Sequence, residues 1–335
     1  MKIAINGFGR IGRIFLRNIL LHPEIRVVAI NDLTDTQTLA HLFKYDSVHR
    51  GFKGTVSFDD NSLIINGNHI QVFAERDPLK LPWKTLDIDI VIESTGKFTS
   101  KTGAEAHLTA GARQVIISAP STDKNVPTVV LGVNDREVDL QSSVLSNASC
   151  TTNNVAAMVK ILDENWGIID GYITTVHSMT GDQSLHDAPH KDLRRARAAS
   201  ASIIPTTTGA AKAITAIFPH LDGHLGGAGI RVPVLNGSLT DFTCSLKKQP
   251  TIVQINEAFK QAANGPMKNV LEYTEDPVVS TDILDNPHSC IFDAQLTSIV
   301  GGLVKVVGWY DNEMGYSSRL ADLVVRIAEL KKQPA

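Results

Sequence analysis

The sequence has few cysteines, little excess charge and no long hydrophobic run. Its three cysteines are odd in number and widely spaced, so they form neither a disulfide pattern nor a zinc-binding pattern. A formal net charge of −3 provides no basic field for nucleic acid. No window reaches the apolar length of a membrane helix, and the first residues lack the segments of a secretory signal. We therefore expect a cytoplasmic protein that binds no metal, nucleic acid or membrane.

The first 149 residues alternate short apolar runs with longer amphipathic stretches. This alternation is typical of parallel strands buried between helices, as in a doubly wound α/β domain. The strand-like runs are residues 3–5, 27–30, 90–92, 115–117 and 129–131. One interruption differs, because Asn66-Gly67 lies between two β-rich runs and predicts a hairpin.

The residues after 149 carry longer strand-like runs in which the side chains alternate. Residues 237–246 show this alternation, and residues 303–310 form a similar run. A mostly antiparallel sheet with a few helices fits the pattern, so an α+β domain is predicted for residues 150–312. Apolar residues then recur at helical spacing within residues 316–332.

A glycine-rich segment, Gly7-Phe8-Gly9-Arg10-Ile11-Gly12, follows the first predicted strand and opens a helical stretch. Its glycines permit a tight turn, close approach to a pyrophosphate and close helix–strand packing, while the helix N-terminus offers N–H groups to phosphates. Asp32 follows the next strand, where a carboxylate accepts hydrogen bonds from ribose hydroxyls and repels a 2′-phosphate. The alternative for Asp32 is a residue that caps a strand end. The segment predicts a site for NAD.

Cys150 lies where an apolar strand gives way to small polar residues and then to a helical pattern. The N-terminus of that helix would favour thiolate over thiol and would stabilise an oxyanion. The alternative is a small buried cysteine, which is what free cysteines usually are. Cys244 and Cys290 fit that alternative because apolar residues flank them. For Cys150 the residues alone leave both interpretations open.

A cysteine nucleophile needs a base, and the sequence offers eleven histidines. His177 ends a β-rich run just before a polar loop, where sites often assemble, but no local rule selects it. His220 and His224 have no evident third ligand and predict no metal site. The basic cluster at residues 194–197 is interpreted as a solvated or interface surface rather than a nucleic-acid site.

Several segments together resemble the phosphorylating glyceraldehyde-3-phosphate dehydrogenases, over essentially the whole chain. The matching segments are residues 5–13, 149–153, 189–195, 205–212, 231–233 and 309–316. The resemblance implies a homotetramer, with a Rossmann domain at 1–149 that a C-terminal helix at 313–335 rejoins, and a catalytic domain at 150–312. It also implies oxidation of glyceraldehyde 3-phosphate with NAD and inorganic phosphate to 1,3-bisphosphoglycerate.

The same resemblance implies roles for individual residues. Cys150 matches the family nucleophile, which forms a hemithioacetal and then a thioester, and His177 matches the base. Cofactor contacts are implied for Arg10, Ile11, Asp32, Arg76, Ser118 and Asn312. Asn312 would orient the nicotinamide. The site for the substrate phosphate is implied at Thr180, Asp182 and Arg231. The site for the attacking phosphate is implied at Ser149, Thr151, Thr208 and Gly209.

The chain departs from the family pattern at Asn154, which stands where many members carry a second cysteine. Two alternatives to the phosphorylating enzyme remain. Erythrose-4-phosphate dehydrogenase resembles this chain at residues 146–153, but it needs less of a phosphate site, so Thr208-Gly209 favours the phosphorylating enzyme. The other alternative is a non-catalytic interaction role on the same fold, and the intact set of Cys150, His177 and Arg231 argues against a loss of catalysis.

Overall fold

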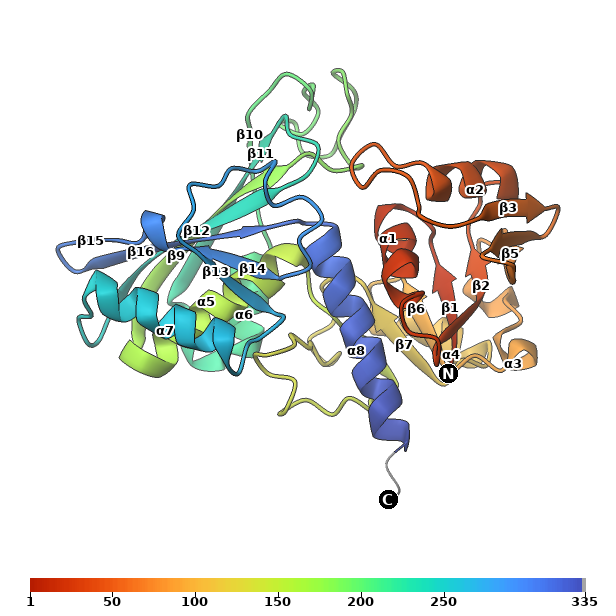
Figure 1. Ribbon diagram of the computed structural model, residues 1–335, viewed down its shortest axis with the longest axis horizontal. Helices are drawn as coiled ribbons and strands as arrows, with labels where there is room; N and C mark the ends of the chain where they lie inside the picture. The colour runs from red at the N-terminus through yellow and green to blue at the C-terminus, as the bar shows by residue number, and fades with distance from the viewer. Residues whose placement is uncertain (333–335) are drawn as a thin grey trace. The chain divides into compact units, whose positions relative to one another are not determined.

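The computed structural model describes residues 1–332, which form two compact units (Figure 1). The first unit contains Met1–Val129, Asp135–Ala148 and the chain from Ser317 onward, and the second contains Val130–Asn134 and Ser149–Tyr316. The end of the helix predicted over 313–335, residues 333–335, lies outside the described part. Within residues 1–332, no helix is both long and apolar enough to cross a membrane.

An eight-stranded, mostly parallel sheet forms the first unit, in the order β3-β4-β5-β2-β1-β6-β7-β8. The strands are β1 (Lys2–Asn6), β2 (Arg26–Asn31), β3 (Val56–Asp59), β4 (Ser62–Ile65), β5 (Asn68–Phe73), β6 (Ile90–Glu93), β7 (Gln114–Ile117) and β8 (Val144–Ser146). Every residue of β6, β7 and β8 is buried, as expected for a parallel sheet covered on both faces. The predicted doubly wound α/β architecture is confirmed.

The helices of the first unit are α1 (Arg10–Ile19), α2 (Thr36–Lys44), α3 (Trp83–Leu86), α4 (Lys101–Thr109) and most of α8 (Met314–Lys332), with a short 3-10 helix η1 (Pro78–Lys80). The α1 helix begins within the glycine-rich segment, directly after Gly9, and buries Ile14, Phe15 and Leu16. Another core cluster gathers around Trp83 and Val115. Apolar packing thus fixes the position of each helix start relative to the strand end that precedes it.

Two local predictions in the first unit have opposite outcomes. The hairpin is confirmed, because β4 and β5 pair antiparallel and are joined by Asn66 and Gly67, with φ of 50° and 80°. The strand predicted at residues 129–131 is wrong. This segment follows an isolated bridge at Thr128 and leads into a turn. Its apolar run reflects burial, which a turn satisfies as well as a strand does.

A second eight-stranded sheet forms the core of the second unit, in the order β10-β11-β9-β12-β16-β14-β13, with β15 paired to β16. The strands are β9 (Ile168–Ser178), β10 (Ile204–Thr206), β11 (Leu225–Val232), β12 (Ser238–Leu246), β13 (Leu271–Thr274), β14 (Cys290–Asp293), β15 (Ser298–Val300) and β16 (Leu303–Tyr310). Most pairs are antiparallel, as predicted, whereas β9 with β11 and β13 with β14 are parallel.

Alternating burial along β12 shows how this sheet is used. Ser238, Thr240, Phe242, Cys244 and Leu246 are all buried, and the residues between them are half-buried. The helices of the second unit are α5 (Cys150–Trp166), α6 (Ala210–Ile217) and α7 (Ile252–Asn264), with 3-10 helices η2 (Pro219–Leu221) and η3 (Ala294–Leu296). The long helix α5 packs on β9, β12 and β16 (Figure 1). Its first turn therefore lies over the sheet.

Candidate active site

The predicted cofactor residues of the first unit follow the carboxyl ends of neighbouring strands. The glycine-rich segment follows β1, Asp32 follows β2, and Ser118 follows β7. Because β2, β1, β6 and β7 are adjacent and parallel, these segments emerge at one edge of the sheet. That edge is where open α/β sheets bind nucleotides.

The three glycines of the first turn are required for different physical reasons. Gly7 has a φ of 93°, and a Cβ there would lie 2.7 Å from the main-chain nitrogen of Thr95. A Cβ at Gly12 would overlap the carbonyl oxygen of Gly7. A Cβ at Gly9, by contrast, would meet no atom within 4 Å. Two glycines thus permit packing, and the third leaves open space beside the start of α1.

Asp32 is fixed by main-chain donors. One carboxylate oxygen accepts the N–H of Phe8 at 2.8 Å, and the other accepts the N–H of Thr34 at 3.0 Å. Each oxygen keeps a further lone pair for a ribose hydroxyl. The guanidinium of Arg10 is bound by Asp46 at 2.5 and 3.1 Å, so its charge is already paired within the protein.

Ile11 lies in the first turn of α1 and is half-buried, as is Ser118, whose N–H donates to the carbonyl of Glu93 at 2.9 Å. Arg76 follows β5 and is exposed. These positions fit a ligand that spans the strand ends. The cofactor roles of the individual residues stay predictions.

A buried polar network under these loops was not predicted. The Asn31 NH2 group donates to the Asn6 Oδ1 at 2.7 Å and to the carbonyl oxygen of Glu75, and the Asn31 Oδ1 accepts the main-chain N–H of Glu75. The Asn6 amide donates in turn to the carboxylate of Glu93 at 2.5 Å. His107 also contacts Glu93 and accepts the indole N–H of Trp83. These contacts join residues far apart in the sequence, so no local pattern signals them.

In the second unit, Cys150 is the first residue of α5 and is only partly buried. Ser149 caps the helix, because its hydroxyl accepts the N–H of Thr152 at 3.1 Å. The sulfur therefore lies beside the free N–H groups of a helix N-terminus, as predicted. Cys244 and Cys290 are fully buried, which confirms their structural interpretation.

Strand pairing brings the second predicted catalytic residue to the first. The Nε2 of His177, near the end of β9, lies 3.5 Å from the Sγ of Cys150. Because β9 and β11 run parallel and pair His177 with Arg231, the Arg231 guanidinium reaches the Nδ1 of His177 at 2.6 Å. The carbonyl of Ser178 lies 2.8 Å from the same nitrogen. The carbonyl of Ser178 accepts only from a protonated Nδ1, whereas the guanidinium of Arg231 donates only to an unprotonated Nδ1. The two groups therefore favour opposite tautomers of the His177 ring.

The electrostatics of the pair are set by burial and by Arg231. Burial raises the pKa of the Cys150 thiol, whereas the charge of Arg231 and the N–H of Thr151 lower it. Burial and then the charge of Arg231 lower the pKa of His177 to about 4. Desolvation is the largest of these effects, so the pKa of the Cys150 thiol lies above its ordinary value. Near pH 7 the pair is a thiol beside a neutral imidazole.

Tyr310 is a site residue that sequence reasoning missed. Its hydroxyl lies 2.9 Å from both the Thr151 and Thr175 hydroxyls, and its ring meets His177 edge-on at 6.0 Å between centroids. Tyr310 thereby ties the first turn of α5 to β9. The Thr151 hydroxyl is consequently directed toward Tyr310.

Two of the predicted anion-binding residues, Thr180 and Asp182, form a cluster with Arg195. The Asp182 carboxylate accepts the Thr180 hydroxyl and the Arg195 guanidinium, the latter at 2.9 Å. Arg195 also donates to Thr206 at 3.0 Å, whereas the sequence assigned the basic cluster at 194–197 only to a solvated or interface surface. The Thr208 hydroxyl accepts the N–H of Ala210 at 3.2 Å, beside Gly209 at the start of α6. Two arginines and free helix N–H groups make this unit suitable for anions.

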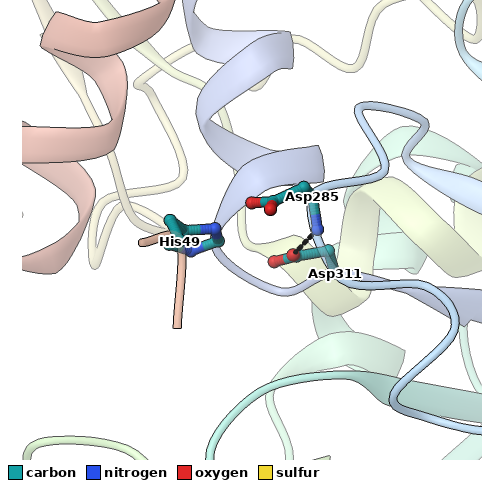
Figure 2. A group of neighbouring side chains, drawn as sticks. All are labelled: His49, Asp285 and Asp311. Carbon is teal, nitrogen blue, oxygen red and sulfur yellow. Dashed lines mark hydrogen bonds between the residues drawn. The ribbon is translucent and has the colours of Figure 1, made fainter. Parts of the chain in front are cut away.

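Asn312 and its neighbour Asp311 follow β16. The Asp311 carboxylate is buried and accepts four N–H groups, including the main-chain N–H of Asp285 at 2.8 Å (Figure 2). The N–H groups of Glu313 and Met314 belong to this set, so Asp311 fixes the turn that leads into α8. Asn312 is held rigidly within this turn.

Comparison with known proteins gives two family matches that together account for most of the chain. Residues 1–101 match the family described as glyceraldehyde 3-phosphate dehydrogenase, NAD binding domain, and residues 149–312 match its C-terminal domain. A glyceraldehyde-3-phosphate dehydrogenase of Thermotoga maritima is 54% identical over 324 residues, 96% of this chain and 97% of the relative. One from Geobacillus stearothermophilus is 52% identical over 330 residues, 98% of each chain.

Proposed function

The chain belongs to the glyceraldehyde-3-phosphate dehydrogenase family, and we propose that it oxidises and phosphorylates glyceraldehyde 3-phosphate to 1,3-bisphosphoglycerate. NAD is its cofactor. The observation that carries the proposal is the sulfur of Cys150, at a helix N-terminus and 3.5 Å from the imidazole of His177. A nucleophile, a base and nearby anion-binding groups are the parts that such a reaction needs.

In the first step the Sγ of Cys150 bonds to the aldehyde carbon. The thiol proton passes by way of His177 Nε2 to the former carbonyl oxygen, which yields a hemithioacetal. Because the resting pair is a thiol and a neutral imidazole, proton transfer accompanies attack. The N–H groups at the start of α5 stabilise the charge that develops on the oxygen.

The second step is oxidation. When bound, NAD would supply the acceptor for the hydride that leaves the substrate carbon. His177 takes the hydroxyl proton of the hemithioacetal at the same time, and the carbon becomes a thioester. A phosphate oxygen then bonds to the thioester carbon, the C–S bond breaks, and the Cys150 sulfur is released. The acyl phosphate keeps the oxidation energy that hydrolysis would lose.

Two sets of residues are proposed for the two phosphates. Arg231, Thr180 and Asp182 would hold the phosphate of the substrate. Their support is two sets of contacts. Asp182 accepts hydrogen bonds from Thr180 and Arg195, and the Arg231 guanidinium lies against His177. The attacking phosphate is assigned to a second set, namely Ser149, Thr151, Thr208 and Gly209. Its support is the free N–H groups at the starts of α5 and α6.

We further propose a homotetramer in the cytoplasm. Large apolar side chains in the second unit are left exposed, among them Leu193 at 81% and Ile203 at 71%. A neighbouring subunit would cover them, and the basic segment at 194–197 would belong to that contact. Three free cysteines, one of them a nucleophile, suit a reducing compartment.

The test is NADH formation with glyceraldehyde 3-phosphate, with and without inorganic phosphate. We expect sustained turnover only when phosphate or arsenate is present. Without either anion, a burst near the active-site concentration should stall at the thioester. Steady turnover without phosphate, with erythrose 4-phosphate preferred, would assign the chain to the non-phosphorylating alternative. Complete inactivity with either aldehyde would favour a non-catalytic role.

A pair of variants separates the two phosphate sets. Thr208→Ala removes one hydroxyl, which is worth roughly 0.5–1.5 kcal/mol, and should raise the KM for phosphate about two- to tenfold. Arg231→Leu removes a charged donor and should mainly raise the KM for aldehyde. If Thr208→Ala lowers only thermal stability and leaves the phosphate KM unchanged, its hydroxyl merely caps α6.

A further inference from the structure

The carboxamide of Asn312 sits in a cradle of three donors. Its Oδ1 accepts the hydroxyls of Ser178 and Ser238, each at 2.9 Å, and the main-chain N–H of Gly237 at 3.2 Å. Asn312 is 6% exposed. A carbonyl oxygen has two lone pairs, so three donors saturate it. The Oδ1 of Asn312 is therefore fully used by the protein.

The cradle also determines which way the amide faces. The N–H of Gly237 can only donate, so a flipped Asn312 would place its own NH2 group against another donor. Both serine hydroxyls would then have to turn away from a buried group. The amide therefore has one stable orientation, with the NH2 group directed away from the cradle.

We propose that Ser178 and Ser238 are positioning residues that hold the Asn312 NH2 group toward the carboxamide of the nicotinamide. This inference rests on the proposed function, because it assumes that Asn312 binds the cofactor. An NH2 group only donates, so it recognises a carbonyl oxygen on the pyridine ring and fixes the ring's rotation. The ring face that receives hydride is then set by two serines that touch neither substrate nor cofactor.

Strand register explains how the cradle arises. β9 and β12 are antiparallel neighbours, and the Ser178 N–H donates to the Ser238 hydroxyl at 3.1 Å. Ser178 has a second function, because its carbonyl contacts His177 and Arg231. The same residue thus links the base to the amide of Asn312. Ser238 has no such contact with His177 and gives the cleaner test.

The main experiment follows the stereochemistry of hydride transfer. Holoenzyme is supplied with glyceraldehyde 3-phosphate that carries deuterium at the aldehyde carbon, and NMR locates the deuterium at C4 of the NADH. The wild type should place it on one ring face. Ser238→Ala should reduce kcat/KM for NAD about two- to tenfold and place a measurable fraction on the other face. Ser238→Thr, which keeps the hydroxyl, should restore the wild-type result.

The chain offers a matched control on the same strand face. Thr240 is fully buried, and its hydroxyl has no hydrogen-bond partner within the described residues. Thr240→Val therefore removes a buried β12 hydroxyl without touching the cradle. It should leave the deuterium on one face. Equal leakage in Thr240→Val and Ser238→Ala would show that β12 packing, not the cradle, orients the ring.

Asn312→Asp tests the direction of the amide. A carboxylate suits three donors, so the thermal unfolding temperature should not fall. It has no N–H, however, so kcat/KM for NAD should fall about tenfold or more, beyond the effect of Ser238→Ala. Wild-type kinetics in Asn312→Asp, or one-sided transfer in Ser238→Ala, would overturn the inference. A wild type that forms no NADH would instead overturn the proposed function.

Discussion

The two units differ in whether the main chain or the side chains provide the functional groups. In the first unit, the groups available to the cofactor are mostly main-chain N–H groups at the start of α1, and glycines make room for the ligand. In the second unit, side chains from α5, β9 and β11 would supply the proposed nucleophile, the proposed base and a positive charge. Binding through main-chain N–H groups depends on a short segment whose glycines lack side chains. Chemistry by side chains depends instead on the register between strands that are distant in the sequence. Substitutions that remove a side-chain group should therefore impair activity most in the second unit. Substitutions that add a side-chain group to a glycine should do most harm in the first.

The largest effect is expected at Cys150. Cys150→Ser removes the nucleophile, and turnover should fall by about 10³ or more. Cys244→Ser and Cys290→Ser are the controls and should retain most activity, because both sulfurs are buried in the core. Iodoacetamide with mass spectrometry should label Cys150 fastest. Inactivation that accompanies labelling of Cys244 would contradict the assignment.

His177 comes next. His177→Asn should lower kcat by roughly 10²–10⁴, measured by steady-state kinetics. The buried pKa of about 4 also predicts a stability effect. The unfolded chain binds a proton near pH 6.5 and the folded chain does not, so the free energy of unfolding should fall as pH drops from about 6.5 to 4. In urea unfolding, the free energy of unfolding of His177→Asn should fall less over this pH range than that of the wild type. An equal fall in both proteins would show that His177 does not cause the pH dependence.

Asp32 should decide the cofactor. Asp32→Gly removes a carboxylate that accepts ribose hydroxyls and repels a 2′-phosphate, so the preference for NAD over NADP should narrow about 10- to 100-fold. The measurement is kcat/KM with each cofactor. Asp35→Asn is the control, since it removes a nearby charge and keeps the cap of α2. A wild type with equal specificity constants would rule out the carboxylate's role.

The smallest effect uses added methyl groups. Gly12→Ala should destabilise the fold by about 1–3 kcal/mol, because its Cβ overlaps the Gly7 carbonyl. Gly9→Ala meets no atom and has a φ of −73°, so its thermal stability should not change. Calorimetric NAD binding should nevertheless weaken in Gly9→Ala, because its methyl group enters the ligand's space. Unchanged affinity would place the pyrophosphate elsewhere.

Sequence patterns predicted what is encoded locally. The glycine-rich turn, the Asn66-Gly67 hairpin and the helix that begins at Cys150 each depend on a few consecutive residues. The apolar run at 129–131 misled because burial and strand formation share one signal. The choice of His177 among eleven histidines needed the family resemblance, since its position beside Cys150 depends on how α5 packs on β9.

The residues that sequence reasoning missed are those whose function depends on partners far along the chain. Tyr310 lies 135 residues from its partner Thr175, and Ser178 lies 134 residues from its partner Asn312, which the family resemblance did indicate. Serine and tyrosine are common in strands, so neither residue stands out in its own segment. Only the pairing of β9, β12 and β16 brings them together.

The burial of two of the three sulfurs makes each folded chain a molecule with a single chemical handle. Cys244 and Cys290 are sealed in the core, while Cys150 is the one partly exposed thiol within residues 1–332. A fluorophore, spin label or affinity tag that reacts with thiols will therefore attach once per folded chain, and at the position where chemistry occurs. Whole-protein mass can then count occupied sites in a mixture, and a second adduct reports that a core has opened.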